Sequence, residues 1–272
     1  MTLTKISAPT ALRLCPGACT MLLLASALAG STNVIAADSP GTAFEPITPY
    51  RPSVSSPAQL PSPRQLELEL GILHARTGDQ RRDRLPYQFK LAFSPQWGVL
   101  IGGEAFVSNR ENGERVRGLG DTNLVLKRAF LVDSATAFGL ELGVKVPTAR
   151  DVIGSGSADQ VVNGIFSRDL GSVHMDTNLN FTRMGRIEDG AGRMQTGLSA
   201  SFSQPINAQF GVTAELSGTR RSGASSTAQM LLALSYSPTK LLTMDMGVIR
   251  GLNSASPDLA LFTGLVLPLA KF

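Results

Sequence analysis

The sequence is poor in the residues that support metal, redox and nucleophilic chemistry. Its two cysteines, Cys15 and Cys19, lie close to the N-terminus, in a segment expected to be removed from the mature protein. The exported chain would then have no thiol for a disulfide, a nucleophile or a thiolate metal site. The two histidines, His74 and His174, have no metal-ligand spacing. We therefore predict no metal site and no cofactor.

Long apolar runs are also missing after the N-terminal segment. The first 37 residues contain no acidic residue, two basic residues, Lys5 and Arg13, and an apolar run around residues 18–29. This pattern is typical of a secretory signal, and the run is shorter than the roughly 20 residues of a membrane-spanning helix. Residues 1–37 are predicted to be a signal peptide for Sec-type export. Small residues also allow cleavage after residue 29, and an uncleaved anchor is the alternative.

The charge balance excludes one class of partner. Removal of the leader takes away only two of the 25 basic residues and none of the 21 acidic ones. Although the isoelectric point is about 9.3, no basic helix is indicated and the chain is predicted to be exported. Nucleic acid is therefore not expected as a partner.

Residues 38–63 form a proline-rich segment with little periodicity, which disfavours both helix and strand pairing. We predict a periplasmic arm that acts as a tether. The alternatives are an arm that enters the following domain as a plug and an arm that contacts a periplasmic partner. The prolines are Pro40, Pro46, Pro49, Pro52, Pro57, Pro61 and Pro63.

The clearest inside/outside pattern lies in residues 118–148. Apolar residues of 138–146 fall on one parity, and glycine, Glu141 and Lys145 fall on the other. Alternation with period two predicts strands, and the short DSAT segment predicts an antiparallel hairpin. If facing residue numbers sum to 268, Lys127 faces Glu141; if they sum to 266, Asp121 faces Lys145.

The same alternation recurs throughout residues 64–272 and predicts twelve strands. They cover about 64–74, 86–94, 98–108, 119–131, 136–147, 160–168, 172–183, 193–203, 207–218, 227–237, 241–251 and 259–272. Long polar connectors, the first two at 75–85 and 108–118, alternate with short turns, as in bacterial outer-membrane barrels. We therefore predict an all-β, transmembrane, antiparallel up-and-down barrel in the bacterial outer membrane. A soluble sandwich is the alternative.

Several features of the chain are shared with one known family: GLGDTNLVLKRAF, LELGVKVPT, the isolated Glu215, MDMGVIRGL and the terminal Phe272. Through them the chain resembles the meta-pathway phenol-degradation family of outer-membrane, transporter-like proteins. The resemblance covers about residues 64–272 and implies a barrel linked to uptake of aromatic or other hydrophobic compounds. It also implies that the barrel assembly machinery recognises Phe272. The chain departs from the family pattern at Ala270, where an aromatic residue is usual.

Polar residues on the inward parity are candidates for a channel lining, although a hydrogen-bonded lattice that fills a narrow barrel is an equal alternative. The candidates are Glu104, Asp121, Asn123, Lys127, Glu141, Lys145, His174, Asp176, Asn178, Glu215 and Asp245.

Arginines concentrate in the connectors expected outside the cell. Guanidinium groups suit phosphate, so this extracellular rim could hold lipopolysaccharide or gather anions, while a solvated rim of mixed charge is the simpler interpretation. The rim candidates are Arg81, Arg82, Arg84, Arg115, Arg117, Arg220 and Arg221.

Evidence for an enzyme is thin. His174 shares a parity with Asp176 and Asn178, but no GxSxG motif occurs, so no catalytic residue is assigned. The predicted function is a passive, transporter-like channel for small solutes, with outer-membrane lipid as surroundings. The alternatives are a closed structural barrel whose loops bind ligands and, further behind, an outer-membrane hydrolase.

Overall fold

The structure, a computed structural model, describes residues 43–272. The expected signal peptide, its cleavage sites and both cysteines lie outside these residues. Among the described residues, no helix is long and apolar enough to cross a membrane.

The described chain is built from antiparallel strands of about 10 to 15 residues, with one shorter strand, β4. The strands are β1 (Gln65–Thr77), β2 (Gln80–Ala92), β3 (Trp97–Glu111), β4 (Glu114–Gly118), β5 (Thr122–Leu131), β6 (Thr136–Val146), β7 (Asp159–Leu170), β8 (Val173–Arg183), β9 (Met194–Pro205), β10 (Phe210–Arg221), β11 (Thr227–Thr239), β12 (Leu242–Gly251) and β13 (Leu259–Lys271).

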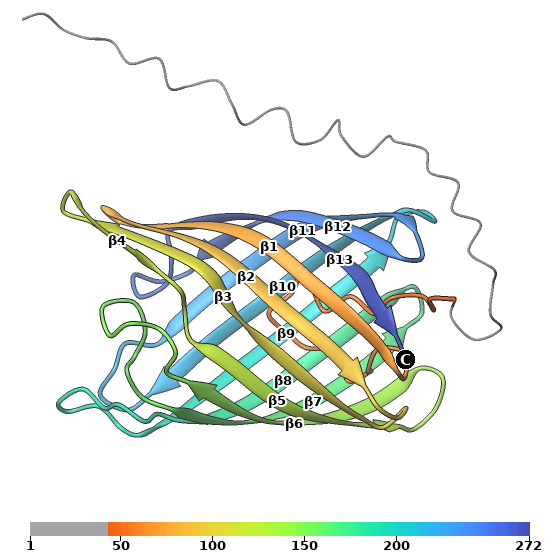
Figure 1. Ribbon diagram of the computed structural model, residues 1–272. Coiled ribbons are helices and arrows are strands. Elements are labelled where there is room, and N and C mark those ends of the chain that lie inside the picture. The colour runs from red at the N-terminus through yellow and green to blue at the C-terminus, as the bar shows by residue number, and fades with distance from the viewer. Residues whose placement is uncertain (1–42) are drawn as a thin grey trace, which may run out of the picture. The chain divides into compact units, whose positions relative to one another are not determined.

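Twelve of these strands close into a barrel, which confirms the predicted fold. The first strand, β1, pairs with β2 on one side and with the last strand, β13, on the other, where Gln65 faces Lys271. The short strand β4 pairs only with β3 and extends that hairpin beyond the wall (Figure 1). Closure leaves the wall without a free edge, so the backbone groups of the spanning strands are paired.

The two faces of the wall differ as the alternation predicts. In the β5–β6 hairpin Lys127 pairs with Glu141 and Asn123 with Lys145, so facing residue numbers sum to 268. This register turns the charged side chains toward the lumen.

Apolar side chains cover the outer face. A soluble protein rarely exposes so large a continuous apolar surface, whereas a membrane barrel presents it to lipid. We therefore describe the fold as a transmembrane barrel. Exposed residues of this belt include Leu124, Leu126, Phe138, Leu140, Leu142, Leu198, Leu216, Leu232, Met246 and Leu261.

The two ends of the barrel differ in their connections. Both ends of the barrel domain lie at one end, here called the turn end, where the connections span only 93–96, 132–135, 171–172, 206–209 and 240–241. The opposite end, the loop end, carries the longer segments 147–158 and 184–193. This asymmetry agrees with the predicted interleaving of long loops and short turns.

Two of the predicted long connectors are wrong. Residues 75–85 continue β1 and β2 to a tight turn at Gly78, which has a positive φ of 55°. Residues 108–118 form the β3–β4 hairpin, whose turn holds Asn112 and Gly113 at φ values of 49° and 85°. Their polar composition reflects strands that extend beyond the apolar belt, where both faces can be solvated.

The proline-rich arm is not a free tether in its described part. Residues 43–63, here called the arm, enter the barrel from the turn end and return to it at β1 (Figure 1). The structure thus places the arm in the lumen, which was the alternative to the predicted tether. The reason lies in its backbone amide groups, which find acceptors on the inner wall.

Candidate functional site

Side chains of the wall satisfy the backbone of the arm. Carboxylate oxygens of Glu69 and Glu215 accept hydrogen bonds from the amides of Tyr50, at 2.7 Å, and of Val54 and Ser55, both at 2.8 Å. Buried amides left without a partner are costly, and bonds to charged acceptors are the stronger ones. The inward acids therefore do more than line a lumen, because they hold the arm.

Further contacts continue along the arm. Asn178 accepts from the amide of Ser56 and donates to its carbonyl, both at 2.8 Å, and the hydroxyl of Ser167 accepts from the amide of Ala58 at 2.8 Å. The proline positions of the arm have no amide hydrogen and so need no acceptor. Proline and side-chain acceptors together explain how a segment without ladder pairing lies in a barrel.

Tyr50 is the centre of the buried part of the site. Two ammonium groups lie over its ring: Lys90 Nζ is 4.3 Å from the ring centre and Lys127 Nζ is 4.2 Å from it. Burial, and then the negative charges of Glu141 and Glu69, raise the pKa of Tyr50 above its usual value. The phenol therefore stays neutral and offers its face to the two cations.

Both lysines also form ion pairs with the wall. Lys90 Nζ lies 3.1 Å from Glu67 and 2.6 Å from Glu69, and Lys127 Nζ lies 3.0 Å from Glu141. The side chains of Lys90 and Lys127 are fully buried. These charges meet the requirement that a buried ion have a close partner.

Arg51 occupies a fitted slot in the wall. Its Nε and Nη2 atoms donate to the two carboxylate oxygens of Asp245 at 2.9 and 2.8 Å. A Cβ atom at Gly71 or Gly264 would come within 2.5 Å of the Arg51 guanidinium group, so the absent side chains make room for it. The ring of Phe262 lies 5.9 Å from the guanidinium carbon. We call Asp245, Gly71, Gly264 and Phe262 the Arg51 slot.

A polar cavity of about 640 Å³ lies in the lumen, with Ser56 of the arm among its lining residues. Arg82, Glu104, Asp121 and Lys145 give it charges of both signs. Apolar contacts come from Leu100, Val125 and Ile153, and an aromatic ring from Tyr87.

Ion pairs order the charged groups of this cavity. Lys145 Nζ lies 2.5 Å from Asp159 and 3.7 Å from Asp121, and Arg82 and Arg84 lie 2.9 and 3.1 Å from Glu104. Both predicted charge pairs of the β5–β6 hairpin are thus close in space, although only Lys127 and Glu141 face each other directly in the ladder.

A smaller cavity of about 190 Å³ continues beside the arm. It shares Ser56, Tyr87 and Gln88 with the larger one, and its lining reaches Arg51 and Glu69. The linings of the two cavities together run from the charged pairs Arg82–Glu104 and Lys145–Asp121 to Arg51.

Every lumen candidate named from the sequence lies on the inner side of the wall or at its rim. Glu104, Asp121, Asn123, Glu141 and Lys145 line the larger cavity. A second group lies against the arm. These residues are Lys127, Asn178, Glu215 and Asp245.

His174 and Asp176 lie near the turn end. The ring nitrogens of His174 approach two carboxylates, Nδ1 to Asp169 at 2.5 Å and Nε2 to Asp176 at 3.2 Å. A hydrolase base needs one ring nitrogen against the hydroxyl of the nucleophile. Here Asp176 lies between His174 and Ser167, whose hydroxyl donates to the same carboxylate at 2.5 Å. Among residues 43–272 no group of three or more potential ligands is placed to hold a metal ion.

The predicted arginine rim divides into two sets. Arg82 and Arg84 lie in β2 and point to Glu104 on the inner face. A second set lies in strand segments near the loop end, where Arg115 donates to Ser108 and Arg221 pairs with Glu188. The members of that set are Arg81, Arg115, Arg117, Arg220 and Arg221.

Tyr50 and Arg51 are functional residues that sequence reasoning did not single out. A tyrosine and an arginine within a proline-rich segment carry no periodic signal, because the segment has no strand register. The sequence does contain one signal for a binding partner inside the barrel. Glu215 and Asp245 are inward acids without a cross-strand cation, and such acids need another partner.

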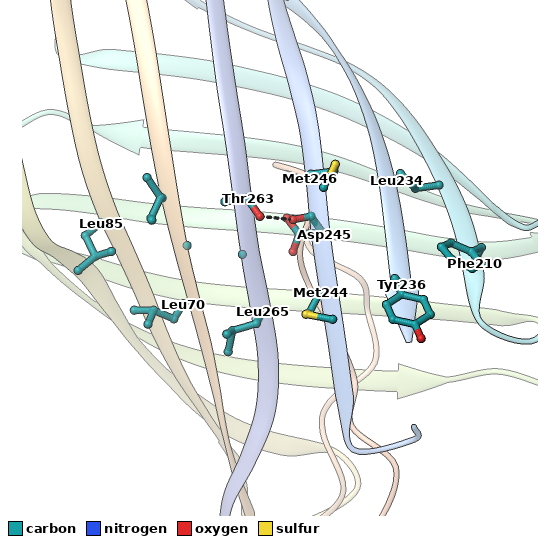
Figure 2. A pocket seen from close by; sticks show the side chains of 13 residues that line it. Leu70, Leu85, Phe210, Leu234, Tyr236, Met244, Asp245, Met246, Thr263 and Leu265 are labelled. Atoms are coloured by element: carbon teal, nitrogen blue, oxygen red, sulfur yellow. Dashed lines mark hydrogen bonds between the residues drawn. The ribbon is translucent and has the colours of Figure 1, made fainter. Parts of the chain in front are cut away.

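A third cavity, of about 520 Å³, lies on the outer face of the wall. Figure 2 shows Leu70, Leu265, Met244 and Tyr236 along its lining, with Thr263 bonded to the carbonyl oxygen of Asp245. Gly71, Asp245 and Gly264 belong to both this depression and the Arg51 slot. The wall is therefore thin at this point, with apolar surroundings on one side and Arg51 on the other.

The fold is similar to that of a solved porin, and further outer-membrane channels match it more distantly. A KdgM porin is 12% identical, with 73% of this chain and 98% of that chain covered, at a TM-score of 0.50. The CymD monoaromatic hydrocarbon channel is 9% identical over 78% of this chain and 89% of that chain, at 0.47. An anion-selective porin from Comamonas acidovorans is 9% identical over 75% and 98%, at 0.42. The chain matches no protein-family model and no curated protein.

Proposed function

We propose that this protein is a passive channel of the bacterial outer membrane that admits small solutes. The observation that carries the proposal is the pair of adjacent cavities, which share lining residues, inside a closed wall whose outer face is apolar. Charged groups of both signs line this space, which hydrates a solute path within a membrane barrel.

The lining supports a substrate class. Tyr87, Leu100, Val125 and Ile153 offer apolar contacts beside Arg82 and Lys145. A small aromatic compound that carries a hydroxyl or carboxyl group would use both kinds of surface. This agrees with the resemblance to the phenol-degradation family, which implies aromatic or other hydrophobic solutes.

The surroundings follow from the same proposal. The apolar belt would contact lipid, and the exposed arginines at the loop end would contact lipopolysaccharide phosphates. Phe272, by the same resemblance, would present the last strand to the assembly machinery.

A closed structural barrel remains a second candidate because the arm fills part of the lumen. Its backbone is held at several points by Glu67, Glu69, Glu215 and Asn178. In that case the loops 147–158 and 184–193 would bind ligands.

Planar-bilayer recordings of the purified full-length mature protein separate the two candidates. A channel gives discrete current steps, and small hydroxylated or carboxylated aromatic compounds reduce them while a large sugar does not. A closed structural barrel gives no steps at any applied voltage. Liposome swelling with the same solutes provides an independent measurement that does not depend on ion current.

A further inference from the structure

The barrel is complete without the arm. Each spanning strand pairs with two neighbouring strands, and β1 closes directly on β13. Single side-chain bonds from the wall hold most of the arm, for example from Glu215, Asn178 and Ser167. Movement of the arm would therefore break side-chain contacts and leave the ladder of the wall intact.

The Arg51 slot provides the most specific of these contacts. Two parallel bonds join the guanidinium to Asp245, whose side chain is only 1% exposed. The missing side chains of Gly71 and Gly264 shape the space around it. Planar bidentate recognition of this kind is selective for arginine over lysine.

Arg51 itself lies beside the open space inside the barrel. The smaller cavity includes Arg51 in its lining, together with Tyr50, Ser53 and Glu69. A solute that enters from the loop end would meet the arm there before it reached the turn end.

We propose that residues 45–58 are a gate, that the salt bridge of Arg51 with Asp245 latches this gate, and that release of the latch completes the solute path. The inference rests on the proposed channel function. In the latched state the arm blocks the path at Tyr50 and Arg51. In the open state the arm withdraws toward the turn end, from which it enters.

The first test removes the latch from the full-length mature protein. Arg51→Ala should raise the open probability in planar bilayers at least about tenfold, which corresponds to about 1.4 kcal/mol. Asp245→Asn should act in the same direction. Arg51→Lys should restore closure only in part, because an ammonium group cannot replace the two parallel bonds. Arg168→Ala, at an exposed position of β7 near the turn end, is the matched control and should leave gating unchanged.

The second test locks the arm in place. The hydroxyls of Ser55 and Ser199 are buried and 2.9 Å apart. A disulfide needs an S–S distance of about 2.0 Å, so Ser55→Cys with Ser199→Cys should bond after a small shift. The mature chain is expected to have no other cysteine. In the Arg51→Ala background the oxidised protein should stay closed, and a reductant should restore the openings. The single Ser55→Cys variant should not respond to oxidation.

The outcomes separate the gate from the channel. Equal, solute-sensitive currents before and after oxidation would leave the channel function in place and overturn the gate. No current in any variant, including the reduced Arg51→Ala protein, would overturn both. If Arg51→Ala does not assemble, the cysteine pair with Arg51 intact supplies the same test, because oxidation should abolish the spontaneous openings of the reduced protein.

Discussion

The ammonium group of Lys127 lies 3.0 Å from the carboxylate of Glu141, directly across the β5–β6 ladder. The same ammonium group donates to the carbonyl of Pro57 and faces the ring of Tyr50. One wall charge thus binds both a neighbouring strand and the arm. Removal of one partner would leave a buried group unpaired, which costs more than the loss of an exposed cross-strand pair worth about 0.2 to 1 kcal/mol.

Mutation of this pair should show a large interaction energy. Lys127→Met or Glu141→Gln alone should destabilise the barrel by about 3 to 5 kcal/mol, since each leaves a buried group without its partner. The double variant should lose less than the sum of the single variants. Midpoints of heat-induced unfolding in detergent measure these effects. Strict additivity, with no change in cation preference of the channel, would contradict the assigned contact.

Closure of the wall predicts resistance to denaturation by detergent. Because β1 pairs with β13 and no spanning strand has a free edge, unboiled protein in SDS should remain folded and migrate differently from boiled protein. Carbonate washing should leave the protein in the membrane fraction. Identical migration before and after boiling, with release by carbonate, would speak for a soluble β-protein.

The alternation of residues predicts the wall well because lipid and lumen impose opposite preferences on successive side chains. Glu141 and Lys145 are recognisable for this reason. The turn at Asn112 and Gly113 was also accessible from the sequence, since Asn-Gly is a strong hairpin signal. The polar residues that flank it predict a long loop instead, but polarity no longer distinguishes a loop from a strand once the strand extends past the membrane.

The arm could not be placed from the sequence for a different reason. Its position depends on hydrogen bonds between its backbone and side chains such as Glu69 and Glu215, which lie 19 to 161 residues away. Such contacts have no period and no fixed spacing. The Arg51 slot is similar, since Gly71 and Gly264 become meaningful only once β1 and β13 lie side by side.

Loss of Phe272 should impair assembly more than stability. Its amide donates to the carbonyl of Arg64 at 2.9 Å, but the residue is 65% exposed and packs little. Deletion should therefore lower the yield in the outer membrane, while the protein that does insert should unfold at nearly the same temperature. Phe93→Ala, which alters another exposed phenylalanine at the turn end, is the control. An unchanged yield would place the assembly signal elsewhere, which the alanine at 270 makes a definite alternative.

The glycines of the Arg51 slot allow the latch to be weakened without a change of charge. A Cβ atom at Gly264 would lie 2.4 Å from Arg51 Nε, too close for the guanidinium to keep its place. Gly264→Ala should therefore increase the open probability in the same direction as Arg51→Ala, and the two changes together should add little to either one.

The matched control for this substitution is Gly143→Ala, which also adds a methyl group to an inward position. The nearest atom to a Cβ at Gly143 is 3.4 Å away, an ordinary contact, so gating should not change. Bilayer recordings of Gly264→Ala, Gly143→Ala and the Gly264→Ala/Arg51→Ala double variant decide the matter. If the two alanine variants behave alike, or if the double variant shows the full sum of both effects on opening, Gly264 does not act through Arg51.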